Sequence, residues 1–250
     1  MTLLEALAVL LAGLGAGTIN TVVGSGTLIS FPVLLAVGYP PVVANVSNAI
    51  GLVPGSAAGA FGYRRELRGQ RARILRLGSA SLTGAVTGAV LLLTLPPSAF
   101  KAIVPAMIAI ALVLIVAQPW LAGLVAARHE RVRTEHGAGL LVAVYLTGVY
   151  GGYFGAAQGI LLLAIFGLLL PDDLQRSNAL KNVLAGTANL VAGIVFILVA
   201  DVAWEAVGLI AIGALVGGTI GARYGRRLSP TALRVVIVVV GVFAIVRLLT

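Results

Sequence analysis

The sequence predicts an all-α, polytopic integral membrane protein. Of its 250 residues, 60% are hydrophobic and only 10% are charged, whereas a soluble domain carries about a quarter charged residues. Two runs, 6–63 and 137–171, contain no Asp, Glu, Lys or Arg. Because one membrane span needs about 20 apolar residues, these runs together hold several crossings or near-crossings.

The basic residues set the expected orientation. Thirteen of the seventeen lie within 64–76, 128–133 and 223–234, in short connections between apolar segments. Loops rich in Lys and Arg face the cytoplasm, so we expect these regions there, both termini outside, and the chain in the cytoplasmic membrane. The net charge of +9 then reflects membrane orientation, and no nucleic acid partner is expected.

Pro, Gly and charged residues divide the chain into ten expected helical segments, in two sets of five. Each set runs long, short, long, long, long, which gives eight long spans and two half-length helices. The expected segments are 3–23, 27–38, 41–63, 72–95, 99–122, 138–156, 160–170, 174–200, 203–223 and 230–249.

These sets predict a first transmembrane repeat over 1–125, a cytoplasmic linker over 126–136 and a second transmembrane repeat over 137–250. An odd number of passes in each set would make the second repeat inverted. Inverted repeats with interrupted helices are a hallmark of secondary transporters. If the two short segments are re-entrant instead, eight spans remain.

Each short segment follows a Gly-rich break, Gly24-Ser25-Gly26 in one set and Ala156-Ala157-Gln158-Gly159 in the other. The N–H groups at a helix start carry partial positive charge, so a helix that starts inside the membrane can hold an anion there. The alternative is that these glycines only allow close helix packing. Packing alone is expected for other Gly-x-x-x-Gly spacings, such as Gly84 with Gly88.

Polar side chains also interrupt the apolar segments. Facing lipid would be costly, so they are expected to face the bundle interior, where they either line a pathway or join helices. Lys181 either sits in the pocket as a counter-charge or extends to the cytoplasmic interface beside Arg176. The candidate substrate-binding residues are Asn20, Ser25, Gly26, Asn45, Ser47, Asn48, Gln158, Gly159, Asn178, Lys181 and Asn182.

Residues 13–62, which include the stretch GAGTINTVVGSGTLISFPVLLAVGYPPVVANVSNAIG, resemble the first half of the TauE/SafE sulfite exporter family. The stretch GGYFGAAQGILLL resembles that family's second Gly-rich turn. The resemblance covers nearly the whole chain and implies transport of a small sulfur-containing anion, such as sulfite or a sulfonate like sulfoacetate. The matching positions of the first half are Gly24, Gly26, Pro32, Val33, Leu34, Leu35, Gly38, Tyr39, Pro40, Ala44 and Asn45.

Several function classes lack support in the sequence. There is no Cys, so disulfides and thiolate metal sites are excluded, and His129 and His136 have no metal-binding spacing. No Ser-His-Asp set lies at one depth, so we expect neither an enzyme nor a cofactor. Two rivals to a transporter remain: a membrane-embedded assembly subunit without transport, and a cation-permeable channel or transporter. The absence of intramembrane Asp or Glu weakens the cation-permeable alternative.

The expected partners are a small anionic substrate, the lipid bilayer and a possible second copy of the chain. Proton-coupled transporters usually relay protons through intramembrane carboxylates or His, and none is visible. A negative cell interior would itself drive an anion outward. Membrane voltage is therefore the expected driving force, with sodium as the open alternative.

Overall fold

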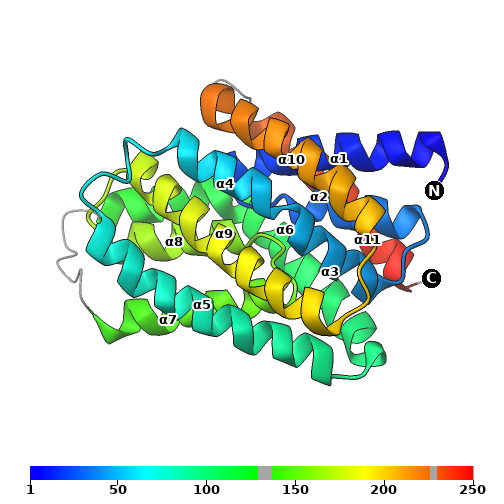
Figure 1. Cartoon of the computed structure of the whole chain (residues 1–250). Helices are drawn as coiled ribbons and strands as arrows, with labels where there is room; N and C mark the ends of the chain where they lie inside the picture. The colour runs from blue at the N-terminus through cyan, green and yellow to red at the C-terminus, as the bar shows by residue number, and fades with distance from the viewer. Residues whose placement is uncertain (129–136, 226–229, 250) are drawn as a thin grey trace.

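A computed structural model of the chain describes residues 1–128, 137–225 and 230–249. All regular secondary structure in these ranges is helical, which confirms the expected all-α class (Figure 1). The helices are α1 (Leu3–Val22), α2 (Thr27–Ala36), α3 (Pro41–Gly51), α4 (Val53–Gly62), α5 (Arg71–Thr94), α6 (Pro97–Arg128), α7 (Ala138–Tyr153), α8 (Gln158–Leu169), α9 (Leu174–Val199), α10 (Trp204–Tyr224) and α11 (Pro230–Leu249).

The expected single segment 41–63 is wrong, because Leu52 separates α3 from α4. Pro54 lies in the first turn of α4. A proline has no backbone N–H and its ring clashes with the preceding turn, whereas it is well tolerated where a helix begins. The chain therefore ends one helix and starts another at this point.

The long helix α6 also differs from its expected bounds of 99–122. It begins at Pro97 and continues to Arg128, into the expected linker 126–136. The rest of that linker, 129–136, lies outside the described residues. The division into a first repeat, a linker and a second repeat therefore stays a prediction.

Five helices within the described residues are long and apolar enough to cross a membrane: α1, α5, the Ser98–Trp120 part of α6, α9 and α10. The apolar helices α2, α7 and α8 are shorter, so the expected count of eight long spans stays a prediction. Large apolar side chains are exposed on the outer faces, among them Val113 and Val116 at 66% and 64%. Such faces suit lipid, since soluble proteins rarely expose large apolar patches.

Two helix pairs from opposite halves of the chain pack side by side in parallel. Along α1 and α10, a Cβ on Gly13 would lie 2.8 Å from Ile210, and a Cβ on Gly217 would lie 2.0 Å from the Leu14 carbonyl oxygen. Along α5 and α7, a Cβ on Gly84 would lie 2.2 Å from the carbonyl oxygen of Tyr145. Contacts this short confirm that the Gly-x-x-x-Gly positions serve close packing.

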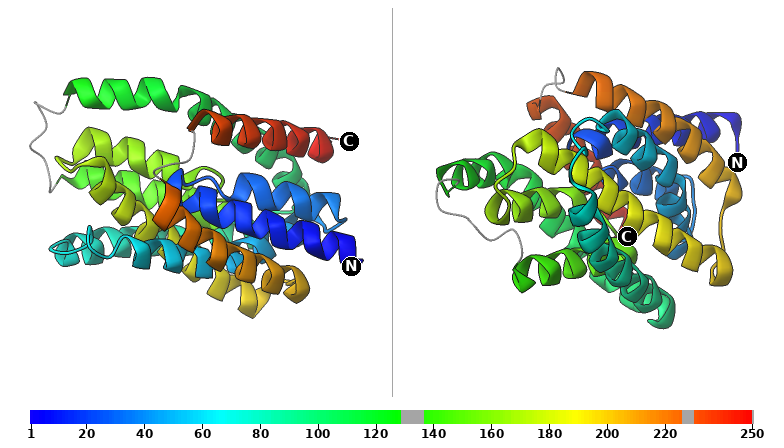
Figure 2. Two further views of the ribbon diagram at one scale, coloured as in Figure 1. Left: turned by 90° about the horizontal axis from the view of Figure 1, so that it is seen from above. Right: turned by 60° about the vertical axis from the view of Figure 1, so that its left-hand side comes forward.

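The remaining helices surround these two pairs. Helices α4 and α3 contact α10, while α9 contacts α5, and α6 packs against α11. Figure 2 shows α6 and α11 together along one side of the molecule. Both chain ends lie at one end of the bundle, and the 63–71 connection lies at the opposite end (Figure 1).

Candidate functional site

The two Gly-rich breaks, far apart in the sequence, touch each other through their backbones. The Gly159 N–H donates to the Gly24 carbonyl oxygen at 3.0 Å. A Cβ on Gly24 would lie 2.4 Å from the Gly159 Cα, and Gly24 also has φ +87°, a conformation that glycine adopts without steric cost. The breaks that end α1 and begin α8 therefore form one junction, which we call the break junction.

The expectation that the start of α8 offers free N–H groups to a ligand is wrong. The first-turn groups of Gln158, Ile160 and Leu161 donate to carbonyl oxygens of the preceding loop, and that of Gly159 donates to Gly24. At α2, Ile29 donates to the Gly26 carbonyl oxygen in the same way. Satisfied donors of this kind leave little for an anion at the start of α8, so a ligand there has to be held mainly by side chains.

Lys181 provides the charge at the break junction. It lies on α9, is 0% exposed, and its Nζ donates to the carbonyl oxygens of Asn20 and Thr21, both at 3.0 Å. These carbonyls belong to the last turn of α1, the negative end of its dipole, which favours a cation. A Cβ on Gly159 would lie 2.9 Å from the Lys181 Cδ. The Lys181 side chain therefore passes the break before α8 to reach the end of α1, and does not extend to an interface.

Amide side chains complete the cap on α1. The Nδ2 atoms of Asn178 and Asn182 each lie 3.3 Å from the Thr21 carbonyl oxygen, so three side chains of α9 converge on that one oxygen. The Asn20 Nδ2 donates to the Ser56 Oγ of α4 at 3.3 Å. The carbonyls in the last turn of α1, which have no partner within the helix, thus accept from charged and polar side chains.

The end of α7 has a simpler cap. The Asn45 Nδ2, on α3, donates to the Tyr153 carbonyl oxygen at 2.9 Å. Asn48, one turn further on, joins the start of α2, where its Oδ1 accepts from the Ser30 Oγ and its Nδ2 donates to the Thr27 Oγ1. These polar side chains of α3 and α2 are buried and the cluster carries no charge, while the Asn45 Oδ1 and the Tyr153 hydroxyl are buried without a hydrogen-bond partner.

Three of the predicted residues have local roles. The Ser47 Oγ accepts from the Ala203 N–H at 2.9 Å, so it ties α3 to the residue that precedes α10. The Gln158 side chain packs against α7, where a Cβ on Gly151 would lie 2.4 Å from its amide carbon. Gly26 begins α2 against α1, and a Cβ there would lie 2.4 Å from the Ala16 carbonyl oxygen.

A charged side chain and buried hydroxyls that lack hydrogen-bond partners lie together near the end of α1. No carboxylate within the described residues pairs with Lys181, and its two bonds use two of the three N–H groups of an ammonium. In the same part of the chain the Thr21 Oγ1 and Ser25 Oγ are buried without a hydrogen-bond partner. A cation with nearby hydroxyl donors can bind a small oxyanion. No group of acidic, His or Cys residues in the described ranges could hold a metal ion.

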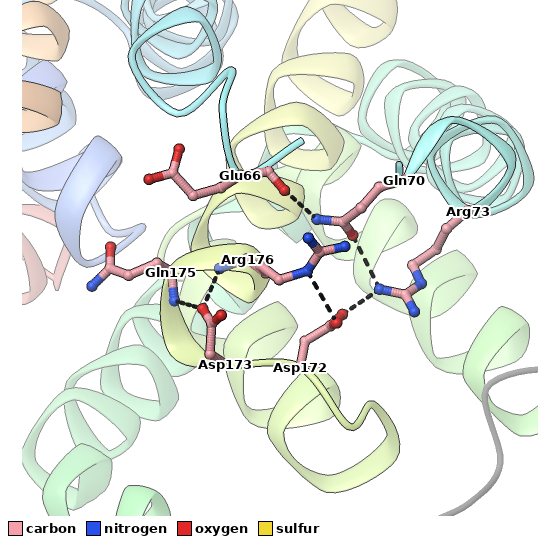
Figure 3. Close-up of polar contacts among 7 residues, drawn as sticks. All are labelled: Glu66, Gln70, Arg73, Asp172, Asp173, Gln175 and Arg176. Atoms are coloured by element: carbon pink, nitrogen blue, oxygen red, sulfur yellow. Dashed lines mark hydrogen bonds and ion pairs between the residues drawn. The ribbon is translucent and has the colours of Figure 1, made fainter. Parts of the chain in front are cut away.

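A separate ionic network lies at the arginine-rich end of the molecule. Asp172 accepts from Arg73 of α5 and from the Arg176 Nε of α9, the latter at 3.3 Å (Figure 3). Asp173 caps the start of α9 by accepting from the N–H groups of Gln175 and Arg176, both at 2.8 Å. This network ties α5 to α9, and it lies apart from Lys181.

Sequence reasoning missed several contributors to the site. The Thr27 and Ser30 hydroxyls, one turn apart on the short helix α2, were detectable as a polar pair in an apolar run. The Thr21 and Tyr153 carbonyl oxygens were not, because a backbone atom becomes part of a site only through the fold.

The helices and the break junction define a polytopic helical membrane protein with a polar, charged centre. A family model described as "Sulfite exporter TauE/SafE" matches residues 9–248, and the chain belongs to this family. It is accordingly a membrane transporter, as the resemblance of its Gly-rich motifs implied.

Several curated relatives are named as probable membrane transporter proteins. ORF9 of Sinorhizobium sp is 29% identical over 94% of this chain and 88% of its own length. YfcA of Escherichia coli K12 is 26% identical over 94% and 86%, respectively. A Haemophilus influenzae protein is 25% identical over 91% and 88%. No solved structure matches the chain.

Proposed function

We propose that the protein is a secondary transporter that moves a small sulfur-containing anion, such as sulfite or a sulfonate, across the cytoplasmic membrane by alternating access. The observation that carries this proposal is Lys181, a fully buried cation to which no carboxylate of the described residues is paired. An unpaired buried charge is costly. A bound anion would compensate that charge, together with the Thr21 and Ser25 hydroxyls.

The helix contacts support an inverted repeat as the frame of this transporter. Helix α1, first in its set, packs parallel to α10, the fourth expected segment of the other set. Helix α7, first in the second set, packs parallel to α5, the fourth of the first set. The contact of α2 with α11 has its counterpart in that of α8 with α6. If each helix is replaced by its counterpart in the other set, each of these contacts becomes another contact that the structure has. Two repeats related by a two-fold axis would show this pattern.

The burial of the break junction supports alternating access as the proposed mechanism. Asn45, Asn48 and Ser25 are each only 1% exposed, so a ligand reaches this centre only when helices move. The half-length helices α2 and α8 meet there, and transporters commonly bind substrate where interrupted helices meet at the repeat interface. Movement of one repeat against the other would open the centre first to one side and then to the other.

The proposed orientation places the arginine-bearing end in the cytoplasm. At the opposite end, burial raises the pKa of the Tyr39 hydroxyl, and Glu205 and Glu5 raise it further. Glu5 lies in the first turn of α1, at the end of the bundle that also holds both termini. The sulfur-containing substrate rests on the family description and on the oxyanion chemistry of a Lys with two hydroxyls.

The test is flux into or out of proteoliposomes. A monovalent anion gains about 2.3 kcal/mol per 100 mV when it leaves a negative interior, so an inside-negative voltage alone should drive sulfite outward. Liposomes without protein and liposomes with the Lys181→Met variant should show no sulfite flux. Flux of rubidium instead of sulfite would favour the cation channel, and no flux of any tested ion would favour the assembly subunit. Export that starts only with a pH gradient would contradict voltage coupling.

A further inference from the structure

An open groove runs between α4 and α10 at the arginine-rich end of the molecule, away from the break junction. Its volume is about 600 Å³. The bottom consists of small side chains, while Phe61 and Leu215, exposed by 68% and 49%, form the walls. The lining residues are Ala57, Ala58, Phe61, Gly62, Arg64, Leu215, Thr219, Ala222 and Arg223.

The groove results from the close approach of two helices with small residues. A Cβ on Gly218 would lie 2.4 Å from the Gly55 carbonyl oxygen, and a Cβ on Gly62 would lie 2.3 Å from the Ala222 Cβ. The helix axes are therefore near each other, and side chains as short as Ala58 cannot fill the outer surface between them. A shallow apolar channel remains on a face that is itself apolar, since Val216 and Ile220 are also exposed.

The channel ends at two guanidinium groups. Arg64 lies with its Cζ 4.6 Å from the centre of the Phe61 ring and donates to the Phe61 carbonyl oxygen at 3.3 Å. Arg223 lies 5.5 Å from the Tyr224 ring. Neither guanidinium is ion-paired within the described residues, in contrast to Arg73 and Arg176, which share Asp172 (Figure 3). Among the residues that the structure describes, no carboxylate lines the groove.

We propose that this groove is a binding site for an anionic phospholipid. The phosphate would lie between Arg64 and Arg223, and one acyl chain would follow Ala57, Ala58 and Leu215 toward the middle of the membrane. Basic pockets between helices at the cytoplasmic side are suited to anionic head groups, and arginine binds phosphate by paired hydrogen bonds. The apolar channel favours a lipid over a free phosphate, because a free phosphate has no acyl chain to lie in the channel.

The two halves of the site make separate demands on the ligand. The guanidinium groups require a negative head group, and the apolar channel requires a chain long enough to lie along it. A bound lipid would join the end of α4 to the end of α10. It would therefore stabilise the folded protein by binding the native state alone.

The test uses the full chain, purified in detergent and delipidated, and then titrated with phosphatidylglycerol or phosphatidylcholine. Binding is followed by native mass spectrometry and by the thermal unfolding midpoint. Phosphatidylglycerol should bind and raise the midpoint, and phosphatidylcholine should not. The Arg64→Gln, Arg223→Gln double variant should bind it about thirtyfold more weakly, since each arginine near an anionic lipid contributes about 1 kcal/mol, or about fivefold in affinity.

A charge-matched control is the Arg65→Gln, Arg68→Gln double variant, because both arginines are exposed on the same connection but do not line the groove. It should bind phosphatidylglycerol like the wild type. Ala58→Trp, which fills the channel without changing charge, should weaken binding, whereas Leu82→Trp on the exposed face of α5 should not. Equal loss in the two arginine variants would overturn the proposal. So would full stabilisation by inorganic phosphate, or unchanged lipid binding in Ala58→Trp.

Discussion

The ends of α1 and α7 come from the first helix of each set of five, yet they are capped differently. Lys181, Asn178 and Asn182 converge on the end of α1, whereas Asn45 alone donates to the last carbonyl of α7. Both ends need a donor, because the final carbonyls of a helix have no partner within it. Only the α1 end carries a charge. Under the proposed function, the anion would bind beside the charged α1 end, and the α7 end would have a structural role.

The contact between the two breaks gives the largest expected loss of stability. Gly159→Ala would place a Cβ 2.5 Å from the Gly24 Cα, and overpacking of this kind costs about 1–3 kcal/mol. We expect a lower thermal unfolding midpoint in detergent. The control is Gly208→Ala on α10, where nothing lies within 4 Å and alanine is the better helix former. A Gly159→Ala midpoint equal to that of Gly208→Ala would contradict the contact.

The two helix ends can be compared directly by removing one amide from each. Asn45→Leu leaves the Tyr153 carbonyl oxygen without its side-chain donor, and an unsatisfied buried acceptor costs about 1–3 kcal/mol. Asn182→Leu leaves Thr21 with Lys181 and Asn178, so we expect a smaller loss of stability. Chemical denaturation of the two variants measures the difference. Equal destabilisation would show that the extra donors on α1 add nothing.

For anion binding, we expect Asn182→Leu to have a larger effect than Asn45→Leu, the reverse of their order in stability. Asn182→Leu removes a polar group beside Lys181 and should weaken sulfite affinity, by about tenfold for a loss near 1.4 kcal/mol. Asn45→Leu should leave the affinity unchanged, once the protein is shown to be folded. Isothermal titration of both variants checks this expectation, and a larger effect of Asn45→Leu would move the binding site to the α7 end.

The smallest expected effect concerns Ser47, which ties α3 to the residue that precedes α10. Ser47→Ala should cost about 1 kcal/mol, as the loss of a single hydrogen bond usually does. Sulfite affinity should not change, because the Ser47 Oγ already accepts from the Ala203 N–H. If Ser47→Ala lowers the affinity for sulfite without lowering stability, Ser47 would be a substrate-binding residue, as the sequence predicted.

Local chemistry made much of the fold predictable. The charge-free runs and the Gly-rich breaks placed the half-length helices near 27–38 and 160–170, and the structure has them at Thr27–Ala36 and Gln158–Leu169. The Gly-x-x-x-Gly spacings marked the packed faces of α5 and α10. The split at Leu52 was missed, since Pro54 in an apolar run is compatible with either a kink or a new helix.

The site was predictable in composition but not in arrangement. Buried amides and Lys181 were expected inside the bundle, and the structure buries them. For Lys181 and Asn45, the partners are backbone carbonyls more than a hundred residues away, those of Thr21 and Tyr153. No local pattern encodes such pairs. For the same reason the free N–H groups expected at α8 were wrong, because the Gly24 carbonyl oxygen that occupies one of them comes from the other half of the chain.

The central claim is that the buried Lys181 ammonium is the counter-charge of the transported anion. Its most direct test is the equilibrium affinity for sulfite of Lys181→Met, with Lys101→Met as the matched control, since these are the two lysines of the chain and Lys101 is exposed. Losing a hydrogen bond to a charged partner costs about 1.5–3 kcal/mol, so Lys181→Met should bind roughly ten- to a hundredfold more weakly. Lys101→Met should bind like the wild type. A folded Lys181→Met protein that binds sulfite with unchanged affinity would contradict the claim.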